Sequence, residues 1–272
     1  MSTAEIDEIF TSYQGEGGSV RGSCHGKRQI FVRFRGCNLH CKWCDSAESR
    51  KSTGKKARVQ TNPFDQSRKD VDSEMTVQQI AKHIARLIRP STHSVSFTGG
   101  EPLLRHIFLH ELLIIMYNDN VFSGVKIFLE TNGTQSKNIG SIITLLDRVS
   151  VDIKDITAFK DMSLDEWITY IVNPEIAMIK KLISGVHYKH VETYAKMVVT
   201  SETDAANIAF VVGRLKNLAV PLVIQPVTTG FCKEVQQPTM EQIDEFMDWA
   251  CAVLGKHYVS LSFQAHRMLN MP

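Results

Sequence analysis

The sequence lacks long apolar runs, a strong net charge and an abundance of cysteine. No stretch approaches about 18 consecutive apolar residues, and the first seven residues have neither a basic start nor an apolar segment, so we expect a cytoplasmic protein with no membrane partner. The net charge of +2 gives no reason to expect nucleic acid as a partner. Six cysteines in 272 residues are too few for a disulfide scaffold, and a chain of this length can form one domain, 1–272, of α/β-barrel size.

Three of the cysteines lie close together. Cys37, Cys41 and Cys44 have C-x3-C-x2-C spacing, with no fourth cysteine nearby. Ferredoxin runs supply four thiolates per cluster, and structural zinc requires a closed tetrahedral set. Three thiolates can instead hold three corners of a 4Fe-4S cluster and leave one iron open, which favours chemistry at the metal. The alternatives are three reduced core cysteines, or a zinc site completed by His25 or His40.

Strand and helix patterns alternate along most of the chain. We expect strands at 29–35, 93–97, 125–129, 149–153, 194–199, 221–225 and 258–263. We expect helices after the capping box of Thr76 and Gln79, at 103–117, 138–146, 164–186 with an interruption at Pro174, 205–215, and from Thr239 to Gly255, with Cys251 in the core. About six β-α units predict an α/β fold, a parallel sheet curled into an incomplete (β/α)6-type barrel, with the cysteine loop after its first strand. Cys24 and Cys232 stay unassigned.

Two segments do not fit the β-α repeat. Glu8 to Gly18 begins like a strand and ends in a glycine-rich loop, where backbone can come close to a ligand. Residues 47–74 are polar and basic and have no period, so they predict an inserted, irregular and partly mobile loop. Contact with nucleic acid is conceivable there, but a solvated insertion is the better interpretation.

Polar motifs follow several of the predicted strands. Thr98-Gly99-Gly100-Glu101-Pro102 lies between a strand and a helix, and Ser150, Asp152 and Lys154 alternate along a later strand. Gln225 precedes a proline that cannot continue a central strand, so it should point into the cavity. Ligands of parallel sheets bind at these strand ends. The alternative for Ser150, Asp152 and Lys154 is an ordinary edge strand.

The cysteine spacing together with Thr-Gly-Gly-Glu-Pro resembles the radical S-adenosylmethionine (SAM) superfamily. More narrowly, the chain resembles the 7-carboxy-7-deazaguanine synthase family in Glu8-Ile9-Phe10, Gln14 to Gly17, Phe31-Val32-Arg33, Gly36 to Leu39, Trp43 to Ser46, Thr98 to Pro102, Glu130 to Gly133, Gln225-Pro226-Val227 and Gln264 to Leu269. The unmatched parts are 47–74 and about 156–190, a family-variable helical segment.

The resemblance implies a ring-contracting lyase. In this family, electron transfer into the cluster cleaves SAM, and the resulting 5′-deoxyadenosyl radical takes hydrogen from C6 of 6-carboxy-5,6,7,8-tetrahydropterin. The substrate radical rearranges, hydrogen is returned, and ammonia leaves to give 7-carboxy-7-deazaguanine, a precursor of 7-deazapurines such as queuosine and archaeosine. SAM is regenerated. The protein's part is to hold the reacting atoms together and to exclude water.

The resemblance also assigns residues. The cluster ligands are Cys37, Cys41 and Cys44; the SAM contacts are Trp43, Asp45, Gly100, Glu101, Ser150, Asp152, Lys154 and Gln225; the substrate contacts are Tyr13, Gln14, Gly15, Glu16, Arg33, Thr98 and the carboxylate of Pro272. The family often has Ser-Pro-Lys where this chain has the longer Ser-Val-Asp-Ile-Lys. A guanidinium fork such as that of Arg33 suits a substrate carboxylate; the alternative is an outward strand charge.

A magnesium ion and two kinds of partner also follow from the resemblance. The family usually binds Mg²⁺ through a threonine after the Cys-Asp pair, and here Ser46 keeps the hydroxyl. The expected partners are the pterin substrate, an electron donor such as flavodoxin or ferredoxin, and a second copy in a homodimer. The rival functions are a glycyl-radical-enzyme activase, disfavoured by Gln14 to Gly17 and Gln264 to Leu269, and a non-catalytic iron-sulfur protein that only passes electrons.

Overall fold

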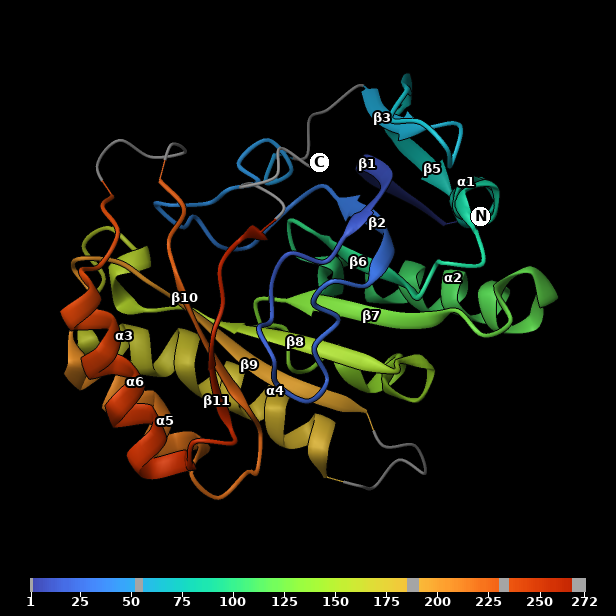
Figure 1. Ribbon diagram of the computed structural model, residues 1–272. Coiled ribbons are helices and arrows are strands. Elements are labelled where there is room, and N and C mark those ends of the chain that lie inside the picture. The colour runs from blue at the N-terminus through green and yellow to red at the C-terminus, as the bar shows by residue number, and fades with distance from the viewer. Residues whose placement is uncertain (1, 52–55, 185–190, 230–234, 266–272) are drawn as a thin grey trace.

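The computed structural model describes residues 2–51, 56–184, 191–229 and 235–265. Its eleven strands form one sheet (Figure 1). They are β1 (Thr3–Tyr13), β2 (Arg28–Phe34), β3 (Lys56–Gln60), β4 (Arg68–Asp72), β5 (Glu74–Thr76), β6 (Ser94–Gly99), β7 (Lys126–Thr131), β8 (Arg148–Ile153), β9 (Glu192–Val199), β10 (Leu222–Pro226) and β11 (Val259–Leu261). The α-helices are α1 (Val77–Leu87), α2 (His106–Asn118), α3 (Leu164–Trp167), α4 (Asn173–Ile183), α5 (Ala205–Leu215) and α6 (Met240–Leu254).

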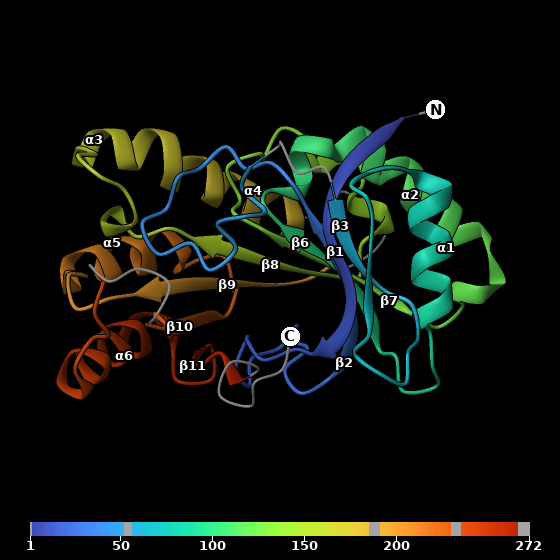
Figure 2. The ribbon, with the colours of Figure 1, turned by 90° about the horizontal axis from the view of Figure 1, so that it is seen from above.

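The parallel part of the sheet follows the chain order. Its strands run β2-β6-β7-β8-β9-β10-β11, and every neighbouring pair is parallel. Figure 2 shows the sheet curled, with the helices along its outer side. This confirms the predicted partial barrel, with the cysteine loop directly after β2, the first parallel strand. Because the strands are parallel, their carboxyl ends meet at one edge, where the polar motifs gather.

The N-terminal strand and the insertion extend the sheet beyond the barrel. β1 is antiparallel to β2, β3 is parallel to β1, and β4 is antiparallel to β3. The prediction of an irregular loop over 47–74 was therefore wrong for the strand residues 56–60 and 68–72, whereas 47–51 and 61–67 are irregular. Ala57 and Val59 are buried while Lys56 and Arg58 are exposed, an alternation too short to recognise in the sequence. Gln60 adds an anchor, since its side chain accepts the backbone N–H of Thr11 at 2.7 Å.

Three predicted helices differ from the structure. Residues 138–146 form two 3₁₀ turns, η3 (Ile139–Ser141) and η4 (Ile143–Leu145), because this short segment contains a glycine and β-branched residues that favour helices little. The helix predicted over 164–186 continues through Pro174 rather than breaking there, and the irregular part is the π-helical η6 (Ile168–Val172) just before it. The helix predicted from Leu103 begins as 3₁₀ turn η1 (Pro102–Arg105). Two more 3₁₀ turns are η2 (Asn120–Phe122) and η5 (Ile156–Ala158).

The core lies between the sheet and its helices. The predicted capping box of Thr76 and Gln79 starts α1, whose apolar stripe is buried against the sheet. Cys251 packs against this core from α6, as predicted. Burial of such stripes, at about 25 cal/mol per Å² of apolar surface, is the main force that holds the strand ends in place. Among the described residues, no helix has the length and apolar character needed to cross a membrane.

Candidate active site

A cavity opens at the carboxyl ends of the parallel strands. Sixteen of the residues predicted to bind ligands line it: Tyr13, Gln14, Glu16, Arg33, Cys37, Cys41, Trp43, Cys44, Asp45, Ser46, Thr98, Gly100, Ser150, Asp152, Lys154 and Gln225. They come from the five strands β1, β2, β6, β8 and β10 and the loops that follow them. The sheet therefore brings together motifs separated by more than 200 residues of chain.

Backbone hydrogen bonds fix the cysteine loop. The loop leaves β2 through Gly36, whose φ of +91° suits glycine and whose N–H donates to the carbonyl of Ser49 at 2.8 Å. Farther on, the N–H of Lys42 donates to the carbonyl of Ala158 at 2.9 Å. Within the loop, the N–H of Leu39 points at the sulfur of Cys37 at 3.4 Å. The three thiols are thus presented on a loop tied down at both ends.

The three thiols are protonated at neutral pH when no metal is bound. Burial raises the pKa of Cys37 and Cys44, and it raises the pKa of Cys41 to about 11. A coordinated thiol loses its proton outright, so binding of iron here releases protons. Within the described part of the chain, no three His, Cys, Asp or Glu side chains converge on one ion; in a 4Fe-4S cluster, each thiolate binds a different iron.

The Thr-Gly-Gly-Glu-Pro turn packs against this loop. A Cβ on Gly100 would lie 2.0 Å from the carbonyl oxygen of Gly36, so only glycine fits. Glu101 is fully buried, and its carboxylate accepts the N–H of Leu103, the hydroxyl of Thr131 and the N–H of Asn132 at 2.8 to 3.0 Å. Glu101 does not line the cavity, so its visible role is to position the loops rather than to contact a ligand.

Three buried polar atoms of the cavity lining have neither a hydrogen-bond nor an ion-pair partner among the described residues. They are the indole Nε1 of Trp43, Oδ1 of Asp152 and Oε1 of Gln225. Leaving such an atom unpaired costs about 1 to 3 kcal/mol. One donor and two acceptors therefore face a space where a polar ligand can satisfy them.

Arg33 lines the same cavity beside the cysteine loop. Its Nη1 donates to the hydroxyl of Ser46 at 3.1 Å, and its Nε lies 3.5 Å from Oε2 of Glu8. Glu8 is also paired with Arg58 and Arg68, from the inserted β3 and β4. The insertion thus supports the guanidinium that was predicted to bind substrate.

Glu130 was not among the predicted contacts. Its buried carboxylate accepts the side-chain amide of Gln14 and the hydroxyl of Thr98, each at 2.7 Å, and a weaker bond from Ser96 at 3.3 Å. Burial, and then the charge of Glu16, raise the pKa of Glu130. Its position at the end of β7, beside a glycine-rich loop, was the available signal.

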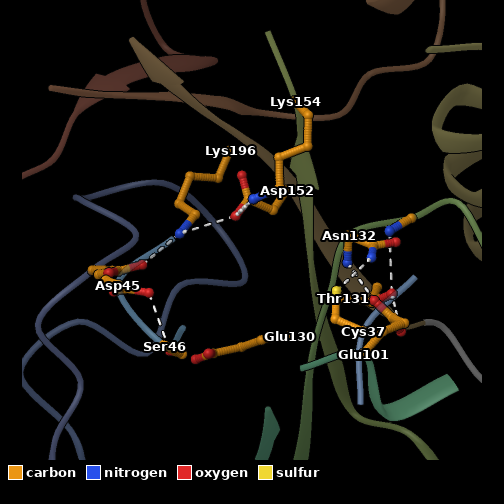
Figure 3. A network of polar contacts seen from close by, with 12 residues as sticks. Cys37, Asp45, Ser46, Glu101, Glu130, Thr131, Asn132, Asp152, Lys154 and Lys196 are labelled. Atoms are coloured by element: carbon orange, nitrogen blue, oxygen red, sulfur yellow. Dashed lines mark hydrogen bonds and ion pairs between the residues drawn. The ribbon is translucent and has the colours of Figure 1, made fainter. Parts of the chain in front are cut away.

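Lys196 is a second residue that sequence reasoning missed. It lies on β9, where a lone charge among apolar residues was the available signal, and its ammonium pairs with Glu16 at 2.5 Å and with Asp152 at 3.6 Å. Asp152 also binds Lys154 at 2.6 Å (Figure 3). Burial lowers the pKa of Lys196, but Asp152 and Glu16 outweigh it and keep the ammonium charged.

Gln264 and Asn132 complete the polar lining. Gln264 Nε2 donates to Glu16 at 2.6 Å and to Asp45 at 2.9 Å, which joins the C-terminal segment to the loop of Cys44. Asn132 Nδ2 lies 3.8 Å from the sulfur of Cys37. Of the remaining predicted contacts, Gly15 is buried outside the lining, and Pro272 lies outside the described residues.

A curled parallel sheet with three cysteines on the loop after its first parallel strand is the architecture of the radical SAM superfamily. The family model described as the Radical SAM superfamily matches residues 31–191. The solved structure of QueE from Escherichia coli aligns with a TM-score of 0.54 at 18% identity, over 96% of this chain and 93% of that chain. A radical SAM methyltransferase from Sphaerobacter thermophilus aligns with a TM-score of 0.59 at 13% identity, over 87% and 66%. At these identities the likeness shows the fold alone.

Relatives found by sequence comparison indicate which family of the radical SAM superfamily the chain resembles. A protein of Thermococcus kodakarensis is 39% identical over 97% of this chain and 97% of the relative. Relatives from Methanocaldococcus jannaschii and Geobacter sulfurreducens are 33% and 30% identical over 98% of this chain, with 99% and 97% of their own lengths covered. All three are named 7-carboxy-7-deazaguanine synthase. The chain belongs to the 7-carboxy-7-deazaguanine synthase family.

Membership of the radical SAM superfamily implies a 4Fe-4S cluster and SAM. The residues present fit both groups. Three thiols from one fixed loop suit a cluster with one open iron, and Gly100 lets the neighbouring backbone approach closely. The unpaired atoms of Trp43, Asp152 and Gln225 lie in the lining of the same cavity.

Proposed function

We propose that this protein converts 6-carboxy-5,6,7,8-tetrahydropterin to 7-carboxy-7-deazaguanine with release of ammonia. The observation that carries the proposal is that one cavity contains the three thiols, the unpaired polar atoms and the Arg33 and Glu130 side chains. The full-length relatives that carry the name of this synthase support it. The activity would serve 7-deazapurine synthesis of the queuosine or archaeosine type.

The cysteine side of the cavity would hold the cofactors. When bound, the cluster and SAM together supply a 5′-deoxyadenosyl radical. Cys37, Cys41 and Cys44 would ligate the cluster, and Gly100 would allow SAM to approach the backbone. Trp43 Nε1 would donate to SAM, while the free oxygens of Asp152 and Gln225 would accept from it. Asp45, Ser150 and Lys154 line the same region and complete the proposed contacts.

The opposite side would hold the pterin. The forked guanidinium of Arg33 suits the substrate carboxylate, which can accept two parallel hydrogen bonds. The oxygens of Glu16 and Glu130 suit the N–H groups of the pterin ring, and a raised pKa allows Glu130 to share or hold a proton at Oε1 or Oε2. Tyr13, Gln14, Gly15 and Thr98 are proposed around them, together with the carboxylate of Pro272.

Ser46 is proposed to bind Mg²⁺. Its hydroxyl lies 3.1 Å from a carboxylate oxygen of Asp45, and hard cations prefer oxygen ligands. Arg33 at present donates to that hydroxyl, so metal binding would turn Arg33 toward the substrate carboxylate. A titration of turnover with Mg²⁺ tests this, since Ser46→Thr should retain the response and Ser46→Ala should lose it. An unchanged response in Ser46→Ala would remove Mg²⁺ from this position.

Two macromolecular partners are part of the proposal. Cleavage of SAM consumes an electron, so a flavodoxin or ferredoxin is proposed as the donor, in the reducing cytoplasm that a thiolate-held cluster requires.

A homodimer is also proposed, and the exposed apolar side chains of Ile107 and Tyr117 on α2 support it. Sedimentation of the wild-type protein and of Ile107→Glu tests the dimer and this face.

The deciding experiment for the reaction is anaerobic incubation with reductant, SAM and the pterin, read by mass spectrometry. The expected result is 7-carboxy-7-deazaguanine and ammonia in equal amounts. A glycyl-radical-enzyme activase would leave the pterin intact, and an electron carrier would show no change of its EPR signal with SAM. Either result would overturn the proposal.

A further inference from the structure

We infer that Lys196 is a positioning residue that couples the two ligand sides of the cavity, because it shares one ammonium between Glu16 and Asp152. This inference rests on the proposed function only for the identity of the second ligand, the pterin. The coupling itself concerns residues of this chain and can be measured with SAM alone.

The register of the sheet places Lys196 between the two sides. Asp152 on β8 is paired with Lys196 on β9, so both side chains leave adjacent strands on the same side of the sheet. The ammonium reaches Glu16 Oε2 at 2.5 Å and Asp152 Oδ2 at 3.6 Å. Figure 3 shows the contact between Lys196 and Asp152. Glu16 belongs to the loop after β1, and Asp152 lines the cavity together with Cys41 of the cysteine loop. Lys196 therefore links the loop after β1 to the end of strand β8.

The charges of this network depend on one another. Lys154 already occupies Asp152 Oδ2 at 2.6 Å, so Lys196 and Lys154 compete for the same oxygen. The ion pair with Glu16 holds the ammonium of Lys196 away from Asp152 Oδ2. If the charge of Glu16 is removed, Lys196 moves toward Asp152. Because the cavity is poorly solvated, this movement strongly changes the electrostatic potential at Asp152.

The other oxygens of the two carboxylates face different partners. Oδ1 of Asp152 has no partner among the described residues and is free to accept from a ligand. Oε1 of Glu16 accepts Gln264 Nε2 at 2.6 Å. A ligand that binds one carboxylate changes how strongly Lys196 interacts with the other carboxylate. By thermodynamic linkage, each ligand then changes the affinity for the other ligand by the same factor.

The test is a double-mutant cycle on SAM affinity, measured anaerobically by calorimetry and by the EPR signal of the reduced cluster. Glu16→Gln should weaken SAM binding roughly fivefold, although Glu16 lies on the substrate side. In a Lys196→Met background the same Glu16→Gln change should have a clearly smaller effect, because only the path through Gln264, which donates to both Glu16 and Asp45, remains. Lys196→Arg should restore the effect of Glu16→Gln. Equal effects in both backgrounds, or no effect in the wild type, would overturn the inference.

Lys196→Met leaves the carboxylates of Glu16 and Asp152 without the cation that they share. Lys196→Gln keeps a hydrogen-bond donor at this position, so it is measured as a second variant. Iron content and thermal unfolding show that each variant is folded and loaded. Lys126→Met, which removes an ion pair with Asp147 at the other end of the strands, is the matched control.

A second experiment measures SAM affinity with and without the pterin. The pterin should change the SAM affinity of the wild type and not that of Lys196→Gln. If the pterin fails to bind the wild type, the proposed function fails, and the SAM-only cycle still decides the role of Lys196.

Discussion

The carboxylate of Glu101 accepts the backbone N–H of Asn132 at 2.8 Å, and so joins the turn after β6 to the turn after β7. The side chain of Asn132 in turn reaches the sulfur of Cys37 (Figure 3). It also accepts the N–H of Thr134 at 3.0 Å. The loops of three neighbouring strands are thus fixed to one another beneath the cysteines. Several outcomes follow from this arrangement of the cavity.

The cluster should depend on three cysteines and on no other described one. Cys37→Ala, Cys41→Ala and Cys44→Ala should each abolish the 4Fe-4S cluster, because a thiolate ligand is lost. Cys24→Ala and Cys251→Ala should keep it, since neither thiol lines the cavity. Iron and sulfide analysis after anaerobic reconstitution measures this. A cluster that persists in Cys41→Ala, or zinc in place of iron, would contradict the assignment.

Gly100→Ala should displace the cysteine loop. The added Cβ would lie 2.0 Å from the backbone oxygen of Gly36, and backbone cannot move aside as a side-chain end can. We expect a loss of about 1 to 3 kcal/mol in the free energy of unfolding and a large loss of SAM affinity. Gly140→Ala is the control, because a Cβ there has nothing within 4 Å. Denaturant unfolding and SAM titration compare the two, and equal behaviour would refute the role of Gly100.

Arg33→Lys should weaken binding of the pterin and spare the cluster. A lysine cannot reproduce a bidentate contact with a carboxylate, so the loss should be about 1 to 3 kcal/mol, visible as an increase in KM. Cleavage of SAM in the absence of pterin should continue. Arg58→Lys is the control, since Arg58 also pairs with Glu8 but does not line the cavity. An unchanged KM in Arg33→Lys would assign Arg33 to a structural role.

Glu175 should make stability depend on pH. Its carboxyl is fully buried, Oε1 accepts the N–H of Lys154, Oε2 has no partner among the described residues, and burial raises its pKa well above the ordinary value. The folded state therefore favours the neutral form. Its contribution to stability is complete below the pKa of the unfolded chain, about 4.3, and is lost as pH rises toward the folded pKa.

Glu175→Gln removes this titration. At pH 8 the variant should be more stable than the wild type by about 1 to 3 kcal/mol, and its stability should vary less between pH 5 and pH 8. Glu245→Gln, on the exposed side of α6, should change neither quantity. Denaturant unfolding across this pH range gives the answer. A wild type that gains stability as pH rises, relative to Glu175→Gln, would show that Glu175 is ionised in the fold.

The sequence predicted most of the fold and the cluster loop because those signals are local. C-x3-C-x2-C, the glycine pair at 99–100 and the capping boxes each lie within a few residues. Lys196 and Glu130 were missed because their partners, such as Glu16 and Gln14, are more than 100 residues away and are brought near only by strand register. The strand β3 was missed for the same reason, since its alternation spans five residues and its partner β1 precedes it by about fifty.

The amount of 7-carboxy-7-deazaguanine formed per molecule of SAM supplied tests the proposed reaction most directly. We expect many molecules of product per molecule of SAM, because the proposed reaction returns hydrogen and regenerates SAM, and we expect no product from the Cys41→Ala variant. Anaerobic assays with limiting SAM, quantified by mass spectrometry, give this ratio together with the amount of 5′-deoxyadenosine. Formation of 5′-deoxyadenosine without loss of the pterin would contradict the proposed reaction.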